Sequence, residues 1–156
     1  MIGIFDSGVG GMTVARAIEM LLPSYRFIYF GDLARTPYGT KSPETIVRYS
    51  VQNAEFLINH GAQVIIIACN SAASVATEVL KKNFDVPIFE VITPAITKAV
   101  QSTRSGRIGV IGTTATIKSS IYEKKLRELS PDYRIFSRAC PEAMTSSARS
   151  MPCAML

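Results

Sequence analysis

Short apolar runs alternate along the chain with longer stretches whose apolar residues recur at helical spacing. The runs typical of strands lie at residues 2–5, 26–30, 64–68, 87–91, 107–111 and 133–137. The stretches with helical spacing lie at residues 13–22, 42–60, 71–83, 94–103 and 115–129. Repeated β-α units of this kind predict a parallel sheet with helices on both faces. We therefore predict the α/β class.

Local signals mark both ends of the helix predicted over residues 42–60. Ser42 is a favoured N-cap, Pro43 suits the first turn, and Glu44 lies where the helix dipole favours a negative charge. A glycine follows the last residue as a C-cap. His60, the only histidine, is therefore interpreted as a capping or solvated residue rather than a catalytic one.

Composition narrows the class of protein. The chain has 156 residues, enough for one ordinary domain or two small ones, and its 47% hydrophobic and 19% charged residues are typical of a globular protein. The formal net charge of +5 admits acidic ligands or nucleic acid. The basic residues are scattered, however, without an Arg-rich arm or an aromatic RNA-binding motif, so we expect solvated helix faces and no nucleic-acid partner.

Several features of the sequence indicate where in the cell the protein is expected to lie. No apolar stretch approaches the ~20 residues of a membrane helix, so no membrane partner is expected. The first six residues are interpreted as a strand rather than a signal peptide. Three cysteines without regular spacing argue against a disulfide framework. We expect a reducing, cytoplasmic location.

Cys69 directly follows the apolar run at residues 64–68. A β-branched run that stops at small and polar residues predicts a buried parallel strand, and ligands bind beyond the carboxyl ends of such strands. Asn70 is predicted to cap the next helix, which would point backbone N–H groups at the thiol and lower its pKa. The alternative is a buried cysteine that acts as a small apolar residue.

Three further strand ends carry small polar loops: DSGVGG at residues 6–11, GDLARTPYG at 31–39 and GTTAT at 112–116. The first lacks both the Lys of a P-loop and the dinucleotide-binding spacing. In the second, Asp32 and Arg35 either pair with each other or leave Arg35 to bind a carboxylate. Ordinary turns and caps explain each loop alone. Together with Cys69, the loops predict a pocket for a small anionic molecule with a thiol inside it.

The order of these motifs resembles the glutamate racemases, within the cofactor-independent aspartate/glutamate racemase superfamily. The resemblance rests on residues 6–11, 34–39 and 68–72, and the residues at 112–116 resemble the opening of that family's second domain. It extends to about residue 141. Ser71 departs from the family, which usually has Thr there, but it keeps the hydroxyl.

The resemblance implies two α/β domains that face each other across a cleft. Here they would comprise residues 1–92, without the C-terminal return, and residues 93–139, an incomplete second domain. The implied reaction interconverts L- and D-glutamate and supplies D-glutamate for peptidoglycan and cell shape, without pyridoxal phosphate or a metal. Family members use two cysteines on opposite faces of the substrate α-carbon. One thiolate removes the α-proton and the other thiol delivers a proton.

Specific residues are carried over by the matching motifs. Cys69 corresponds to the first family cysteine, and Asp6 is implied to assist proton transfer there. The implied substrate-binding residues are Asp6, Ser7, Tyr38, Gly39, Asn70, Ser71, Thr113 and Thr116. No metal ligands are implied.

The second family cysteine has no counterpart in this chain. Its usual context is a Cys-Thr-His-Tyr-Pro-like segment, whereas Cys140 precedes Pro and Cys153 precedes Ala. Residues 140–156 also lose the alternation and are expected to form a divergent, poorly ordered tail. We expect this ending to reflect a frameshift or early stop in a longer racemase gene.

Three interpretations of function stay open at this stage. The chain is a glutamate racemase, or a catalytically dead fragment that binds a small acid, or a racemase for aspartate or a related amino acid. The expected partner is glutamate. The sequence leaves the oligomeric state open, with a homodimer as one candidate.

Overall fold

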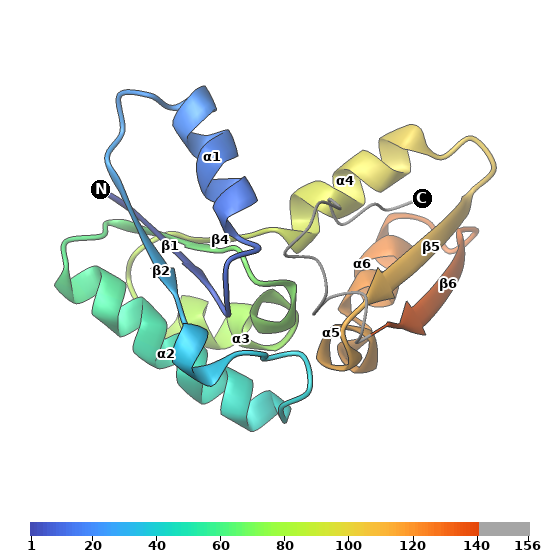
Figure 1. Ribbon diagram of the computed structural model, residues 1–156. Helices are drawn as coiled ribbons and strands as arrows, with labels where there is room; N and C mark the ends of the chain where they lie inside the picture. The colour runs from blue at the N-terminus through green and yellow to red at the C-terminus, as the bar shows by residue number, and fades with distance from the viewer. Residues whose placement is uncertain (141–156) are drawn as a thin grey trace.

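The computed structural model describes residues 1–140 (Figure 1). Its strands are β1 (Ile2–Asp6), β2 (Phe27–Gly31), β3 (Val64–Ile67), β4 (Ile88–Glu90), β5 (Arg107–Gly112) and β6 (Arg134–Ala139). Its helices are α1 (Met12–Leu21), the 3-10 turn η1 (Leu33–Arg35), α2 (Pro43–Asn59), α3 (Asn70–Asn83), α4 (Ile92–Ser102), α5 (Thr114–Ser119) and α6 (Ile121–Leu129). The predicted alternation of strands and helices is confirmed.

The strands form two parallel sheets. The first has the order β2-β1-β3-β4, and β5 pairs with β6 in the second. The register aligns Ile4 of β1 with Tyr29 on one side and with Ile66 on the other. Because all strands in a sheet run the same way, the loops that follow β1, β2 and β3 leave from one edge. This edge carries the candidate site.

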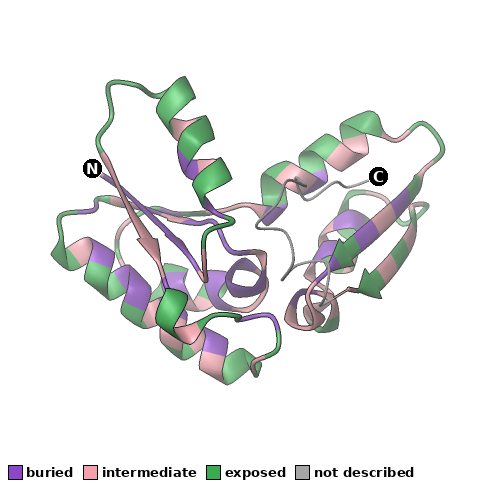
Figure 2. Ribbon diagram, in the orientation of Figure 1, coloured by how far each residue is buried: buried purple, intermediate pink, exposed green. Residues whose placement is uncertain are grey.

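Helices cover both faces of the first sheet, as predicted. Helix α1 lies on one face and α2 and α3 lie on the other (Figure 1). The larger core packs strand residues such as Phe5 and Ile65 against Leu57 of α2 and Leu80 of α3, all with no exposed surface. Each such buried side chain stabilises the fold by about 1.5–3 kcal/mol. Helix α1 is packed more lightly, and Ala15 is its only buried residue (Figure 2).

Helix α2 has the ends that the sequence predicts. Ser42 is the N-cap, and its Oγ accepts the Thr45 N–H at 3.3 Å. His60 is the exposed C-cap residue, and its Nδ1 lies 2.7 Å from the Phe56 carbonyl oxygen. Gly61 follows with φ of +90°, a conformation that glycine adopts without strain. His60 therefore has the capping role expected of it.

Two helix predictions were wrong in detail. The helix predicted over 115–129 is broken at Ser120, whose φ of 56° ends α5 before α6 begins. Helix α4 begins at Ile92 rather than at residue 94, because the Glu90 carboxylate accepts the backbone N–H groups of Ile92 and Thr93. A side-chain cap at the end of the preceding strand thus extended the helix by two residues.

The two sheets are joined through helices. Helix α3 packs against α5, and α4 packs against α6. The division at residue 92 stays a prediction, as does the incompleteness of the second domain. Most of the predicted tail, including Cys153, lies outside the described residues. Within residues 1–140, no helix has the length and apolarity needed to cross a membrane.

Candidate active site

The four polar loops predicted to form one pocket contact one another. The Cys69 sulfur lies 3.3 Å from Ser7 Oγ, which joins the loops after β1 and β3. Ser71 Oγ lies 2.8 Å from Thr113 Oγ1, and the Gly39 carbonyl accepts the Ala115 N–H at 2.9 Å. The loop after β5 therefore contacts the loops after β2 and β3 at the carboxyl edge of the first sheet.

Cys69 itself, not Asn70, is the N-cap of α3. Its backbone is extended, with φ of −91° and ψ of 117°, and its carbonyl accepts the Ala73 N–H at 2.8 Å. These are the properties of an N-cap residue, so Asn70 is the first residue inside the helix. The expectation that Asn70 caps the helix was wrong by one position. The shift places the thiol directly at the helix start.

The thiol is more buried than the sequence suggested. Cys69 is 5% exposed and belongs to the larger core, as the apolar alternative predicted, yet its sulfur also hydrogen-bonds to Ser7. Burial raises the pKa of the thiol, and the negative charge of Asp6 raises it further. Hydrogen bonds from Ser7 and from the Ala72 backbone act in the opposite direction but are the smaller effects. The predicted lowering of this pKa was therefore wrong, because desolvation outweighs the helix start.

Asp6 ends β1 as a buried carboxylate that is 6% exposed. Its Oδ2 accepts the Gly11 N–H at 2.9 Å and lies 3.4 Å from the Tyr29 hydroxyl. A Cβ on Gly11 would lie 2.7 Å from the Asp6 Cβ, so only glycine lets the backbone approach this closely. Burial, followed by the Asp6 charge, raises the pKa of Tyr29. Tyr29 lies in the middle of β2, beside β1, and no local pattern in the sequence marks it as a partner of Asp6.

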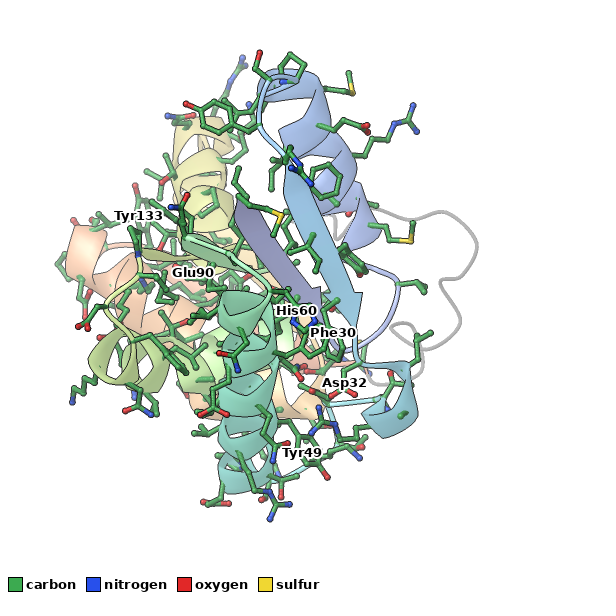
Figure 3. The ribbon with its side chains drawn as sticks, turned by 90° about the vertical axis from the view of Figure 1, so that its left-hand side faces the viewer. Phe30, Asp32, Tyr49, His60, Glu90 and Tyr133 are labelled. Atoms are coloured by element: carbon green, nitrogen blue, oxygen red, sulfur yellow. The ribbon has the colours of Figure 1, made fainter. Side chains whose placement is uncertain are left out.

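A second buried network holds the loop after β2. Asp32, at the carboxyl end of β2 (Figure 3), is 4% exposed and pairs with Arg35 Nε at 2.7 Å. The Tyr38 hydroxyl donates to Asp32 and accepts from Asn53 Nδ2 at 3.0 Å. The alternative in which Asp32 pairs with Arg35 is confirmed. The Tyr38 hydroxyl is buried and hydrogen-bonded within the protein. Its contact with substrate stays a prediction.

The loop after β5 adds hydroxyls. Thr113 is the N-cap of α5 and accepts the Thr116 N–H at 3.3 Å, and its Oγ1 lies 3.0 Å from Thr116 Oγ1. A Cβ on Gly39 would lie 2.5 Å from the Thr113 Cβ, so glycine is required at this contact. Tyr122 of α6 donates to Asn70 Oδ1 at 2.7 Å. The roles of Tyr122 and Asn53 were not predicted, because both residues occupy helix positions that the apolar spacing assigns to the core.

The described residues hold no group of three or more His, Cys, Asp or Glu that is placed to bind a metal. Cys140 follows β6, and its N–H donates to the Gly112 carbonyl at 2.9 Å. These contacts bring a thiol, a carboxylate and several hydroxyls close together. That set suits proton transfer and the binding of a small charged molecule.

Known proteins share this sequence and fold. The Asp/Glu/Hydantoin racemase family matches residues 11–150. The glutamate racemase of Geobacter metallireducens is 50% identical over 140 residues, which are 90% of this chain and 52% of that protein. A glutamate racemase isoform from Bacillus anthracis superposes with a TM-score of 0.90 at 41% identity, over 93% of this chain and 55% of that one.

A further solved structure was determined with a ligand. The glutamate racemase of Francisella tularensis, in complex with D-glutamate, superposes with a TM-score of 0.84 at 37% identity, over 92% of this chain and 54% of that one. The chain thus spans about half the length of the relatives it matches. With the family match over residues 11–150, this chain belongs to the Asp/Glu/Hydantoin racemase family.

Proposed function

We propose that this chain carries the first half of a glutamate racemase site, at which Cys69 exchanges the α-proton of glutamate. The observation that carries the proposal is the contact of the Cys69 sulfur with Ser7, beside the buried Asp6 carboxylate. Similarity to glutamate racemases at 50% identity supports glutamate as substrate. In the whole protein, this reaction would interconvert L- and D-glutamate and supply D-glutamate for the cell wall.

Because the pKa of Cys69 is raised, the substrate has to supply a positive charge that favours the thiolate. In the free protein, burial and the Asp6 charge raise the pKa of the thiol and so favour its protonated form. The α-ammonium group of a bound amino acid brings a positive charge to the site, which lowers the pKa of the thiol and favours the thiolate. The thiolate then takes the α-proton, and the electron pair left on the α-carbon is shared with the substrate carboxylate. Inversion further requires an acid on the opposite face.

The test is exchange of the α-proton in D₂O. The purified chain is incubated with L- or D-glutamate, and α-deuterium is measured by proton NMR and mass spectrometry. We expect exchange with one enantiomer, and its loss in C69S. The C140S variant is the matched control and should exchange like the parent. Undiminished exchange in C69S, or equal exchange of both enantiomers, would contradict the proposal.

A second candidate is a module that binds a small acidic amino acid without reaction. The burial of Cys69 favours it, because a thiol with a raised pKa is unreactive without help. Glutamate binding without any exchange would support this candidate. A panel with aspartate and related acids tests substrate choice in both cases.

Two further properties belong to the same proposal. The free Cys69 thiol suits a reducing compartment, so we place the protein in the cytoplasm. The homodimer stays a prediction, which sedimentation velocity of the purified chain tests.

A further inference from the structure

The hydroxyl of Tyr122 reaches across from α6 to the residue that follows the thiol. It donates to Asn70 Oδ1 at 2.7 Å. The two residues are 52 positions apart, and Asn70 opens α3 directly after Cys69. The Tyr122 side chain is 8% exposed and packs in the same core as Cys69. The contact is therefore held in place by packing on both sides.

This contact fixes which end of the Asn70 amide is occupied. An asparagine side chain has an acceptor oxygen and an NH₂ group with two donors. With the oxygen accepting from Tyr122, turning the amide over would replace this bond by donation from the NH₂ group to the phenolic oxygen, which is a weaker acceptor than an amide oxygen is. Asn70 is only partly buried, and within residues 1–140 the hydrogen bond found for its side chain is the one that Oδ1 accepts from Tyr122. Both of its donors therefore stay available to a ligand.

We propose that Tyr122 is a positioning residue that orients Asn70 so that its NH₂ group donates to a carboxylate of the acidic amino acid bound beside Cys69. The inference rests on the proposed function and deepens it. Without the Tyr122 hydroxyl, the amide would also populate the flipped orientation, in which its carbonyl oxygen faces the ligand carboxylate and repels it. Tyr122 thus selects for an anionic ligand without touching it.

Tyr122 and Asn70 lie on helices beside different sheets of the fold. Tyr122 comes from the helix beside the β5–β6 sheet, whereas Cys69 and Asn70 follow β3 of the first sheet, at the start of α3. The Ser71–Thr113 contact crosses the same boundary at 2.8 Å. Correct orientation of the Asn70 amide therefore depends on the docking of α6 and α5 against α3.

The first experiment measures glutamate affinity by calorimetry for the full chain and for Y122F, N70A and the double variant. Phe keeps the buried ring, and Y133F is the matched control, since Tyr133 precedes β6 at the opposite end of the sheet from Thr113. We expect Y122F to weaken binding about fivefold to tenfold, as for one lost hydrogen bond, and N70A to weaken it more. The double variant should match N70A within about twofold, because the two residues act as one unit.

A second pair of measurements separates orientation from simple packing. N70D can still accept from Tyr122 but has no donors, so it should bind glutamate more weakly than N70A does. The Asn70 side-chain NH₂ signals in a ¹⁵N spectrum, assigned by their absence in N70A, should shift in Y122F and not in Y133F. These readouts need no turnover, and N70D leaves Tyr122 intact if Y122F unfolds.

The outcomes distinguish the inference from the proposed function. Wild-type affinity in Y122F, additive losses in the double variant, or parent-like binding by N70D would overturn the role of Tyr122 while the site itself stands. Parent-like binding by N70A would likewise overturn the inference alone, since the proposed function rests on Cys69. If the parent chain binds neither enantiomer, the proposed site is wrong and the inference falls with it.

Discussion

Replacement of Tyr38 by Phe isolates one hydroxyl in the buried network behind the candidate site. The ring has no exposed surface, and it is retained in the variant. Only the hydroxyl is lost, with its donation to Asp32 and its acceptance from Asn53 Nδ2 at 3.0 Å. The variant therefore tests whether Tyr38 stabilises the loop after β2 or serves chiefly to bind substrate.

The expected loss of stability follows from the partners left behind. Asp32 is 4% exposed and keeps only the ion pair with Arg35 at 2.7 Å, so it loses a hydrogen bond to a charged group, about 1.5–3 kcal/mol. Asn53 is 1% exposed, and its NH₂ group loses the acceptor that Tyr38 provides, which costs about 1–3 kcal/mol. Because the two share one network, the sum is not strictly additive. We expect the free energy of unfolding to fall by about 2–4 kcal/mol.

Urea unfolding followed by circular dichroism measures this change. With a slope of about 2 kcal/mol per molar urea, the midpoint should fall by about 1–2 M at unchanged slope. Tyr25 is 62% exposed, so Y25F is the control and should unfold like the parent. A loss below about 0.5 kcal/mol in Y38F would refute the network argument. A loss of glutamate affinity at unchanged stability would instead support a direct contact with substrate.

Three further predictions concern the thiol, a glycine and the break between α5 and α6. D6N removes the negative charge that, together with burial, raises the pKa of Cys69, so the thiolate fraction below that pKa increases. Alkylation of the Cys69 peptide at pH 7.5, followed by mass spectrometry, should therefore be faster. An unchanged rate would count against an effect of Asp6 on the thiol. G11A forces a Cβ to within 2.8 Å of other side chains, so urea unfolding should show the protein destabilised by about 1–3 kcal/mol. G10A is the control and should not destabilise it, because the nearest atom to its Cβ would lie 3.8 Å away. S120G relieves a φ of 56° and should raise the melting temperature by a few degrees, corresponding to about 0.5–1 kcal/mol; a decrease would contradict a strained serine there.

The sequence predicted the strands and the edge at which the site lies, because both follow from local patterns. The apolar runs at β1 and β3 are buried strands, and small polar residues follow each of them. Cap chemistry at Ser42 was equally local and was confirmed. Predictions went wrong where a distant or unexpected group intervened, as when the Glu90 side chain capped α4 or Ser120 broke the last helix.

The thiol shows why part of a site escapes sequence reasoning. A helix start after a strand suggests a lowered pKa, but the sign depends on how much water reaches the sulfur and where the Asp6 charge lies. Neither quantity is encoded in the neighbouring residues. Tyr29 and Tyr122 were missed for the same reason, since their contacts with Asp6 and Asn70 join distant segments.

The hydroxyls of Ser71, Thr113 and Thr116 form a continuous chain, with separations of 2.8 Å and 3.0 Å. Each hydroxyl both donates and accepts, so the direction of the whole chain reverses by simple rotation of its protons, with no movement of heavy atoms. A chain of this kind can present either an O–H group or a lone pair at each of its ends. Its polarity can therefore follow the charge of a neighbouring group without any rebuilding of the backbone.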